Sequence, residues 1–253
     1  MPSDTHRLRS LYSETLELPP PFHLISLREV GDAFTHAQAV AAEEGAGTLV
    51  HVGRFDLAEF AVVLEPEEPL RLARRSFYAG MVALVDALIA YAPPEKPVTV
   101  AWPGAVSVDG GLIGGGRLAW PAGASEDAPP DWLVFGATIR TVAMGEEEPG
   151  LLPLSSALDQ EGFDDLTSGR LVESFTRHLM VAVDGWQETG FASVGKKYLR
   201  CLAPESGIRS GLDDNGDLLR RHAGKAVDER RPLKAALAAA PSWLDPATGG
   251  PRK

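Results

Sequence analysis

Residues 98–140 place the tightest constraint on the fold, because β-prone segments and glycine-rich turns alternate there. The stretch reads VTVAWPGAVSVDGGLIGGGRLAW, followed by a loop rich in Pro and Asp and then by WLVFGATIR. Asp109-Gly110-Gly111 is a hairpin turn of the kind that needs positive φ, and Pro103 separates two strands because proline cannot donate to a ladder. The expected strands are Val98–Trp102, Ala105–Val108, Leu112–Trp120 and Trp132–Val142. The pattern therefore predicts neighbouring strands of one β-sheet.

The composition is that of an ordinary globular protein with an acidic balance. The chain has 253 residues, 44% of them hydrophobic and 23% charged, and a formal net charge of −11. A nucleic-acid partner is not expected, since such binders carry basic faces, and no apolar run is long enough to cross a bilayer. The N-terminus lacks the apolar core of a signal peptide, and the single cysteine, Cys201, suits a reducing compartment. We therefore expect a cytoplasmic protein with no membrane partner.

The order of helical and β-prone segments predicts an α+β protein, in which a mixed β-sheet packed with helices precedes a small β-rich C-terminal subdomain. Further strands are expected at Phe22–Val30, Thr48–Phe55 and Phe60–Leu64, helices at Asp32–Glu44, Leu70–Ala92, Leu154–Gln160 and Leu171–Thr189, and an acidic loop at Met144–Leu154. Near the end, a hairpin of Gly207–Leu212 and Asp217–His222 precedes a short helix, Arg231–Ala240. The predicted division is an N-terminal arm (residues 1–21), a main domain (22–202) and the subdomain (203–253). The subdomain is too small for much core of its own and should dock on the main domain.

Three motifs resemble those of the biotin and lipoate protein ligase family. Ala101-Trp102-Pro103-Gly104-Ala105 stands at the place of a KWPND-type motif. Gly111-Leu112-Ile113-Gly114-Gly115 stands at the place of a KLGGIL-type strand, and Phe135-Gly136-Ala137-Thr138-Ile139-Arg140 at the place of a strand ending in G-x-G-I-N. The resemblance covers roughly residues 22–202 and implies a class II synthetase or biotin-ligase-like fold. The tail also resembles that of a group of short ligase-like proteins without assigned function.

Ligases of this family join a carboxylate to AMP and pass the acyl group to a lysine of a carrier domain. The resemblance thus implies ATP and biotin, lipoate or octanoate as ligands, with a biotinyl or lipoyl carrier domain as partner. Several family residues are replaced, however: the lysines by Ala101 and Gly111, the Asn-Asp pair by Gly104 and Ala105, and the final asparagine by Arg140. Alanine and glycine cannot bind Mg²⁺, which takes oxygen ligands, so no metal ligand is predicted. The only lysine among residues 1–195 is Lys96.

Three arginines are candidates for the missing positive charge. Gly53-Arg54 stands where the family has a Gly/Arg-rich loop, and Arg54 either holds a phosphate or carboxylate or pairs with Asp56 or Glu59 in a turn, which we favour. Arg117 follows the glycines of its strand and could restore one charge. Arg140 either faces phosphate or is a surface strand residue.

The glycine run Gly114-Gly115-Gly116 has two interpretations. Glycine inside a strand weakens it and often marks close approach of a ligand to the backbone, which we favour over a bulged hairpin that permits helix packing. Trp102 is expected in the core beneath the pocket, and Cys201 as a passive, partly buried thiol. The candidate ligand-binding set is Gly53, Arg54, Trp102, Gly111, Gly114, Gly115, Gly116, Arg117, Gly136 and Arg140, with no catalytic residue assigned.

Three functions remain open from the sequence. The first is a pocket that binds a small carboxylate or its adenylate without efficient turnover, because several charged partners are missing together and each supports a transition state by several kcal/mol. The second is an active ligase or acyltransferase that uses arginines. The third is a module that recognises a carrier domain. We rank them in this order.

Overall fold

A computed structural model describes residues 16–144, 154–225 and 227–253. Most of the expected N-terminal arm and of the expected acidic loop lies outside the described residues. The described elements are, in chain order, β1 (His23–Leu27), α2 (Ala33–Glu44), β2 (Thr48–Val52), β3 (Leu57–Leu64), α3 (Leu70–Ala73), α4 (Ser76–Ile89), β4 (Val98–Ala101), β5 (Ala105–Val108), β6 (Gly111–Ala119), β7 (Leu133–Arg140), the 3₁₀ turn η1 (Leu158–Glu161), α5 (Ser168–Thr189), α6 (Phe191–Cys201), β8 (Ile208–Leu212), β9 (Leu218–His222), β10 (Glu229–Arg231) and α7 (Leu233–Ala238).

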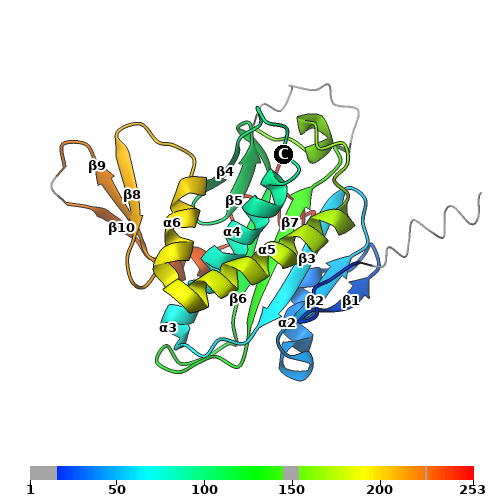
Figure 1. Cartoon of the computed structure of the whole chain (residues 1–253), viewed down its shortest axis with the longest axis horizontal. Coiled ribbons are helices and arrows are strands. Elements are labelled where there is room, and N and C mark those ends of the chain that lie inside the picture. Colours follow the sequence, from blue (N-terminus) through cyan, green and yellow to red (C-terminus); the bar gives the residue numbers. More distant parts are fainter. Residues whose placement is uncertain (1–15, 145–153, 226) are drawn as a thin grey trace, which may run out of the picture.

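Seven of the described strands form one mixed sheet, in the order β1-β2-β3-β7-β6-β5-β4 (Figure 1). β1 and β2 run parallel, and every other neighbouring pair runs antiparallel. β8, β9 and β10 form a separate three-stranded antiparallel sheet. The predicted fold class is therefore confirmed: a mixed sheet packed with helices, with a small β-rich unit after it.

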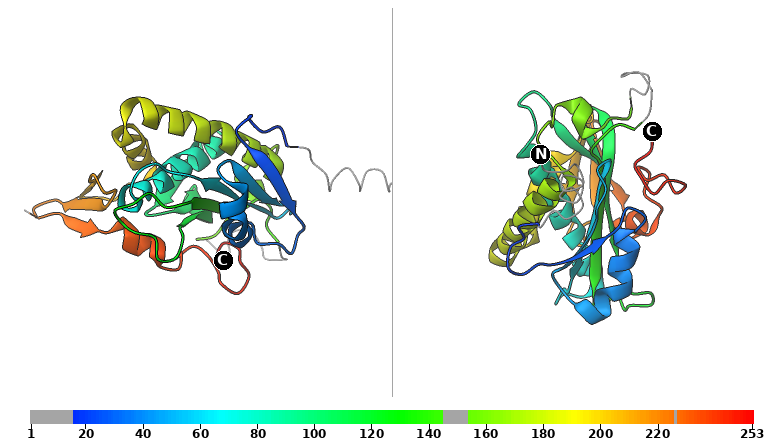
Figure 2. Two further views of the ribbon diagram at one scale, coloured as in Figure 1. Left: turned by 90° about the horizontal axis from the view of Figure 1, so that it is seen from below. Right: turned by 90° about the vertical axis from the view of Figure 1, so that its right-hand side faces the viewer.

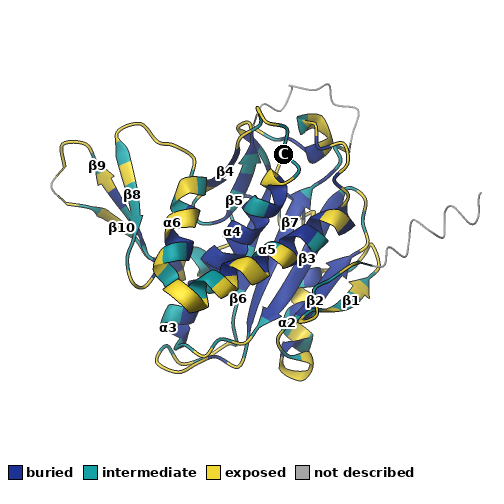
Figure 3. Ribbon diagram, in the orientation of Figure 1, coloured by how far each residue is buried: buried dark blue, intermediate teal, exposed yellow. Residues whose placement is uncertain are grey.

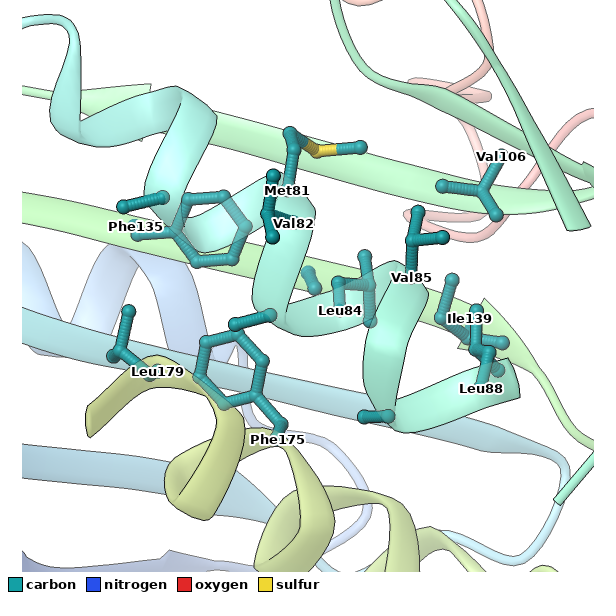
Figure 4. Packing of buried hydrophobic residues seen from close by; sticks show 14 of the residues in the cluster. Met81, Val82, Leu84, Val85, Leu88, Val106, Phe135, Ile139, Phe175 and Leu179 are labelled. Carbon is teal, nitrogen blue, oxygen red and sulfur yellow. The ribbon is translucent and has the colours of Figure 1, made fainter. Parts of the chain in front are cut away.

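The large sheet separates two layers of unequal thickness. Figure 2 shows α4 and α5 on one face of the sheet, and α2 with the C-terminal segment on the other. We call these the helix face and the α2 face. On the helix face, the rings of Phe135 (β7) and Phe175 (α5) stack with their centroids 5.7 Å apart, and Met81 and Leu84 of α4 are fully buried (Figure 4).

Helix α5 follows its amphipathic pattern. Leu171, Phe175, Leu179 and Ala182 are buried at the spacing that places them on one side of a helix, whereas its outer side is exposed (Figure 3). Thr167 caps the helix, because its side chain accepts a hydrogen bond from Arg170 N. The larger hydrophobic cluster thus lies mainly between α4, α5 and the helix face of the sheet.

Several predicted elements differ from the structure for local reasons. The predicted helix Leu70–Ala92 is divided into α3 and α4 by a tight turn with i→i−3 hydrogen bonds, such as Arg75 N to Leu72 O. The predicted helix Leu154–Gln160 is reduced to η1, because Ser156 N and the carbonyl of Leu154 bond to Leu112 of β6 instead. Helix α6 and strand β10 were not predicted.

Candidate functional site

The α2 face of the sheet presents a row of neighbouring residues that is polar at its centre. Glu59 of β3 pairs with Thr138 of β7, and Thr138 pairs with Gly115 of β6. Directly paired residues of an antiparallel sheet project to the same face. The next row consists of Ala61, Gly136 and Arg117. We call these two rows the floor of the candidate site. The floor combines the polar side chains of Glu59, Thr138 and Arg117 with positions that carry little or no side chain.

Two aromatic side chains cover the glycines of this floor. A methyl group on Gly136 would lie 2.5 Å from Phe34 Cδ2 of α2, and one on Gly115 would run into Gly104 O and would lie 2.5 Å from Trp243 Nε1 of the C-terminal segment. Real Cβ atoms do not approach other atoms so closely, so both positions require glycine. Trp243 is 3% exposed. The glycines thus admit aromatic rings of the chain itself against the backbone of the sheet.

The polar centre of the floor is buried and incompletely hydrogen-bonded. Glu59 Oε1 accepts a hydrogen bond from Ala33 N at the start of α2, at 2.9 Å. Burial raises the pKa of Glu59 above its ordinary value, and the nearby Asp32 carboxylate raises it further. Thr138 is 1% exposed, and its Oγ1 has no hydrogen-bond partner. A buried hydroxyl without a partner is costly and is unusual enough to need an explanation.

Arg117 lies at the edge of the same floor, between α2 and the glycines. Its guanidinium carbon stands 4.1 Å from the ring centroid of Phe34, and Nη2 lies 3.5 Å from Asp32 Oδ1. Its Nε is buried without a partner. Burial lowers the pKa of Arg117, while Asp32 and Glu59 oppose that shift. Arg117 Nε is therefore a hydrogen-bond donor without a partner, in a site lined by an aromatic ring and two carboxylates.

Arg54 does not point at this floor as a free cation. It binds Asp56 through two hydrogen bonds, Nε to Oδ1 at 3.0 Å and Nη2 to Oδ2 at 2.7 Å. This is the turn pairing that the sequence favoured, and it raises the pKa of Arg54 and lowers that of Asp56. Gly53 N donates to Leu27 O at 3.0 Å and joins the link after β2 to the end of β1. His51, on the helix face, is 8% exposed and its Nε2 lies 2.8 Å from Ser168 Oγ.

Arg140 binds the two segments that border the end of β7. Its Nη2 donates to Pro251 O at 2.5 Å and to Arg252 O at 3.1 Å. Its Nη1 donates to Ser155 Oγ at 2.5 Å and to Ser156 O at 3.0 Å. Burial lowers the pKa of Arg140. The arginine thus fastens the C-terminal segment to the sheet.

The other glycines of β6 have different neighbours. A methyl group on Gly116 would lie 2.5 Å from Met81 Sδ on the helix face, and one on Gly111 would lie 2.7 Å from Ser156 Cβ. Gly114 has φ 154°, and a methyl group there would run into the carbonyl oxygen of Thr138. The pairing of β5 and β6 shifts register beside this glycine. Close packing against the chain itself therefore accounts for these three positions.

Trp102 connects the main sheet to the small one. Its Nε1 donates to Tyr78 Oη at 3.1 Å, and Tyr78 Oη donates to Gly216 O in the connection between β8 and β9 at 2.5 Å. Trp102 is half-buried against the main core. Tyr198 Oη donates to Pro103 O at 2.6 Å. The Trp-Pro motif thus holds together β4, α4, α6 and the small sheet.

Lys96 and Cys201 do not belong to the two rows of residues that form the floor. Lys96 Nζ stands 2.9 Å from both Asp109 Oδ2 and Glu161 Oε2, and these two acceptors raise its pKa. Cys201 is the last residue of α6 and is partly buried. Burial raises the pKa of its thiol to about 11, which disfavours the reactive thiolate.

The donor set does not fit a magnesium ion. Among the residues that the structure describes, no group of three or more His, Cys, Asp and Glu side chains could hold a metal. Gly104 and Ala105 offer no side-chain oxygen, and Gly104 O already accepts a hydrogen bond from Gly116 N at 2.9 Å. We therefore derive no chemistry through magnesium.

Sequence reasoning missed four residues of this site. Thr138 lies two residues from both Gly136 and Arg140 on β7, so a strand period of two could have placed it on the same face as these candidates. Glu59 is the polar residue of the otherwise apolar β3 and fell outside the predicted strand Phe60–Leu64. Phe34 and Trp243 carry no such signal, because the contact of each with a glycine depends on how α2 and the C-terminal segment pack.

Comparison with solved structures identifies the fold as that of biotin protein ligases. A biotin protein ligase-like protein of unknown function from Silicibacter sp. superimposes with a TM-score of 0.77 at 28% identity, over 89% of this chain and 100% of that chain. The Aquifex aeolicus biotin protein ligase in complex with biotin and ATP gives a TM-score of 0.59 at 16% identity, over 83% and 99%. The Leishmania major biotin protein ligase in complex with biotin gives 0.54 at 16% identity, over 83% and 98%.

A sequence profile of the Biotin/lipoate A/B protein ligase family matches residues 18–200. The chain belongs to this family. A search of curated proteins gave no match. In the part of the chain that the structure describes, no helix is both long and apolar enough to cross a membrane.

Proposed function

We propose that this protein binds a small carboxylic acid, such as biotin, lipoate or octanoate, or its adenylate, on the α2 face of the sheet, without efficient turnover. The candidate contacts are Thr138, Arg117, Gly115 and Gly136, with Glu59 at the edge. Membership of the ligase family and the biotin and ATP bound by the Aquifex aeolicus relative support this ligand class. A cytoplasmic location remains part of the proposal.

The observation that carries the proposal is the pair of buried polar atoms without partners, Thr138 Oγ1 and Arg117 Nε. They belong to adjacent rows on the same face of the sheet. Leaving each of them unpaired costs about 1–3 kcal/mol, and a ligand that offers hydrogen-bonding atoms would recover that cost. Carboxylate and phosphate oxygens accept from arginine, and a threonine hydroxyl can donate or accept.

Weak catalysis is proposed because the three candidate arginines already have partners. Arg54 binds Asp56, Arg117 lies beside Asp32, and Arg140 binds carbonyls of the C-terminal segment. An arginine that offsets the charge of a triphosphate would have to exchange these partners first. Stabilisation of a transition state depends on donors that are oriented in advance.

The test is a thermal-shift and calorimetric series with biotin, lipoate, octanoate, ATP and sulfamoyl analogues of the acyl-adenylates. Binding at 100 times Kd should stabilise the fold by about 2.7 kcal/mol, and pyrophosphate release is measured in parallel. We expect stabilisation by the adenylate analogues with pyrophosphate release near background. Rapid pyrophosphate release would favour the active ligase. If none of the compounds bound or stabilised the protein, the proposal would be wrong, and recognition of a carrier domain would be the function left open.

A further inference from the structure

The last ten or so residues form a closed loop that is seated on the candidate site. Arg252 N donates to Trp243 O at 2.7 Å, and Asp245 N donates to Gly250 O at 2.8 Å. Asp245 also accepts hydrogen bonds from Ala247 N at 3.0 Å and Thr248 Oγ1 at 3.0 Å, which lower its pKa. We call residues 243–252 the C-terminal loop. These hydrogen bonds lie within the loop and do not involve the sheet.

The C-terminal loop is fastened to the sheet at two points of different chemistry. Trp243 lies on the backbone of Gly115, and the carbonyls of Pro251 and Arg252 accept hydrogen bonds from Arg140. No disulfide holds the loop, because Cys201 is the sole cysteine of the chain. Both fastenings can therefore open without unfolding a strand of the sheet.

The seated loop covers the floor that the proposed ligand would need. Gly115, under the indole of Trp243, is the direct cross-strand partner of Thr138, whose hydroxyl has no partner. The hollow that remains beside the indole is only about 220 Å³, between Pro103, Gly104 and Arg117 of the main domain and Ala236, Leu237 and Trp243. Ligand sites are typically about 300–1,000 Å³, so an acyl-adenylate does not fit while the loop is seated.

We infer that the C-terminal loop is an intramolecular lid whose Trp243 competes with the ligand for the surface above Gly115 and Thr138. This inference rests on the proposed function. When the binding-competent state is only a fraction of the population, the apparent Kd rises by the reciprocal of that fraction. A lid that is seated in nine molecules out of ten weakens binding about tenfold.

The test compares the full chain with three variants in calorimetric titrations with biotinyl- and octanoyl-sulfamoyl adenosine. Trp243→Ala removes the ring on Gly115, and we expect an affinity about tenfold or more above that of the parent. Trp243→Phe keeps an apolar ring in place and should lie between the two. Trp132→Ala changes a half-buried tryptophan that packs against the apolar residues between α2 and the sheet. It controls for a general loss of stability and should leave the affinity unchanged.

A second measurement uses the parent chain alone and does not depend on a variant that folds. Hydrogen exchange at Asp245 N and Arg252 N should become faster when the adenylate analogue binds, because the ligand displaces the loop. Slower exchange there would show that the loop closes over the ligand and would overturn the inference. Equal affinities of the parent and Trp243→Ala would also overturn it, with the proposed function intact. Failure of both chains to bind either analogue would instead remove the proposed function, and the lid with it.

Discussion

At the scale of single residues, two threonines near the end of β7 differ in whether their hydroxyl group is hydrogen-bonded. Thr138 Oγ1 is buried without a partner, whereas Thr141 Oγ1 donates to Phe55 O at 2.6 Å. Thr138→Val keeps the shape and removes the unpaired hydroxyl, so we expect the free energy of unfolding to rise by about 1 kcal/mol. The same variant should bind the adenylate analogue several-fold more weakly. Urea denaturation and calorimetric titration measure the two effects.

Thr141→Val is the matched control for this comparison. It leaves the carbonyl of Phe55 without its donor, and we expect the free energy of unfolding to fall by about 1–2 kcal/mol. A gain in stability accompanied by a loss of binding is the trade-off expected of a functional site. If Thr138→Val lowered stability as Thr141→Val does, the hydroxyl of Thr138 would have a structural partner and the site would lose its main support.

Glu59 gives a pH-dependent prediction at the same scale. Burial raises its pKa in the folded state, so the folded chain keeps this proton to a higher pH than the unfolded chain. The free energy of unfolding should therefore fall as pH rises from about 4.5 through the raised pKa. Glu59→Gln removes the charge but keeps an acceptor for Ala33 N, so it should be more stable than the parent at pH 7 and equal to it near pH 4. A variant that is less stable than the parent at pH 7 would contradict a pKa of Glu59 that burial raises in the folded state.

At the scale of elements, His51 couples β2 to the first residue of α5. Burial lowers the pKa of His51 from 6.5 to about 4, and its Nε2 lies 2.8 Å from Ser168 Oγ. As pH falls from 6.5 to 4, the unfolded chain takes up a proton that the folded chain does not. The free energy of unfolding should fall by about 3 kcal/mol across this window. Urea denaturation at a series of pH values measures the slope, which His51→Gln should remove.

Ser168→Ala separates the hydrogen bond from the burial of this histidine. Because burial is the cause of the lowered pKa, the variant should lose stability at every pH and keep the slope between pH 6.5 and pH 4. A slope that vanished in Ser168→Ala would instead assign the shift to the hydrogen bond.

The elements that the sequence predicted are those whose pattern is local. Asp109-Gly110-Gly111 marks the turn between β5 and β6, and helix α5 has a clear period of 3.6. Helix α6 was missed, and it begins directly after Gly190, the residue that ends α5. Residues Leu154 to Gln160 were predicted as a helix, although Leu154 O and Ser156 N bond to Leu112 of β6. In this second case tertiary pairing decided the structure.

The residues of the candidate site also differ in whether a local sequence pattern could indicate them. The glycines and arginines of the family motifs were visible in the sequence, and Arg54 has the partner expected for a turn, Asp56. The seat of Trp243 on Gly115 joins residues more than a hundred positions apart, and no local pattern predicts such a contact. The predicted division at residues 22–202 and 203–253 remains a prediction.

At the scale of the whole molecule, the small sheet is held by contacts that cross the predicted boundary at residue 202. Arg75 Nη1 donates to Asp214 O, in the connection between β8 and β9, at 2.8 Å. Tyr78 Oη accepts from Trp102 Nε1 and donates to Gly216 O. A unit of about fifty residues has too little core to fold alone, so these contacts should make its unfolding part of one cooperative transition.

Tyr78→Phe tests this coupling, because it removes the oxygen that both hydrogen bonds share and leaves two buried partners unpaired. We expect the free energy of unfolding to fall by about 2 kcal/mol, with urea transitions that still coincide by circular dichroism and tryptophan fluorescence. Hydrogen exchange should report equal opening free energies for β9 and β6 in the parent, since the small sheet has no stability of its own. If β9 exchanged at a much lower free energy than β6, the small sheet would open independently.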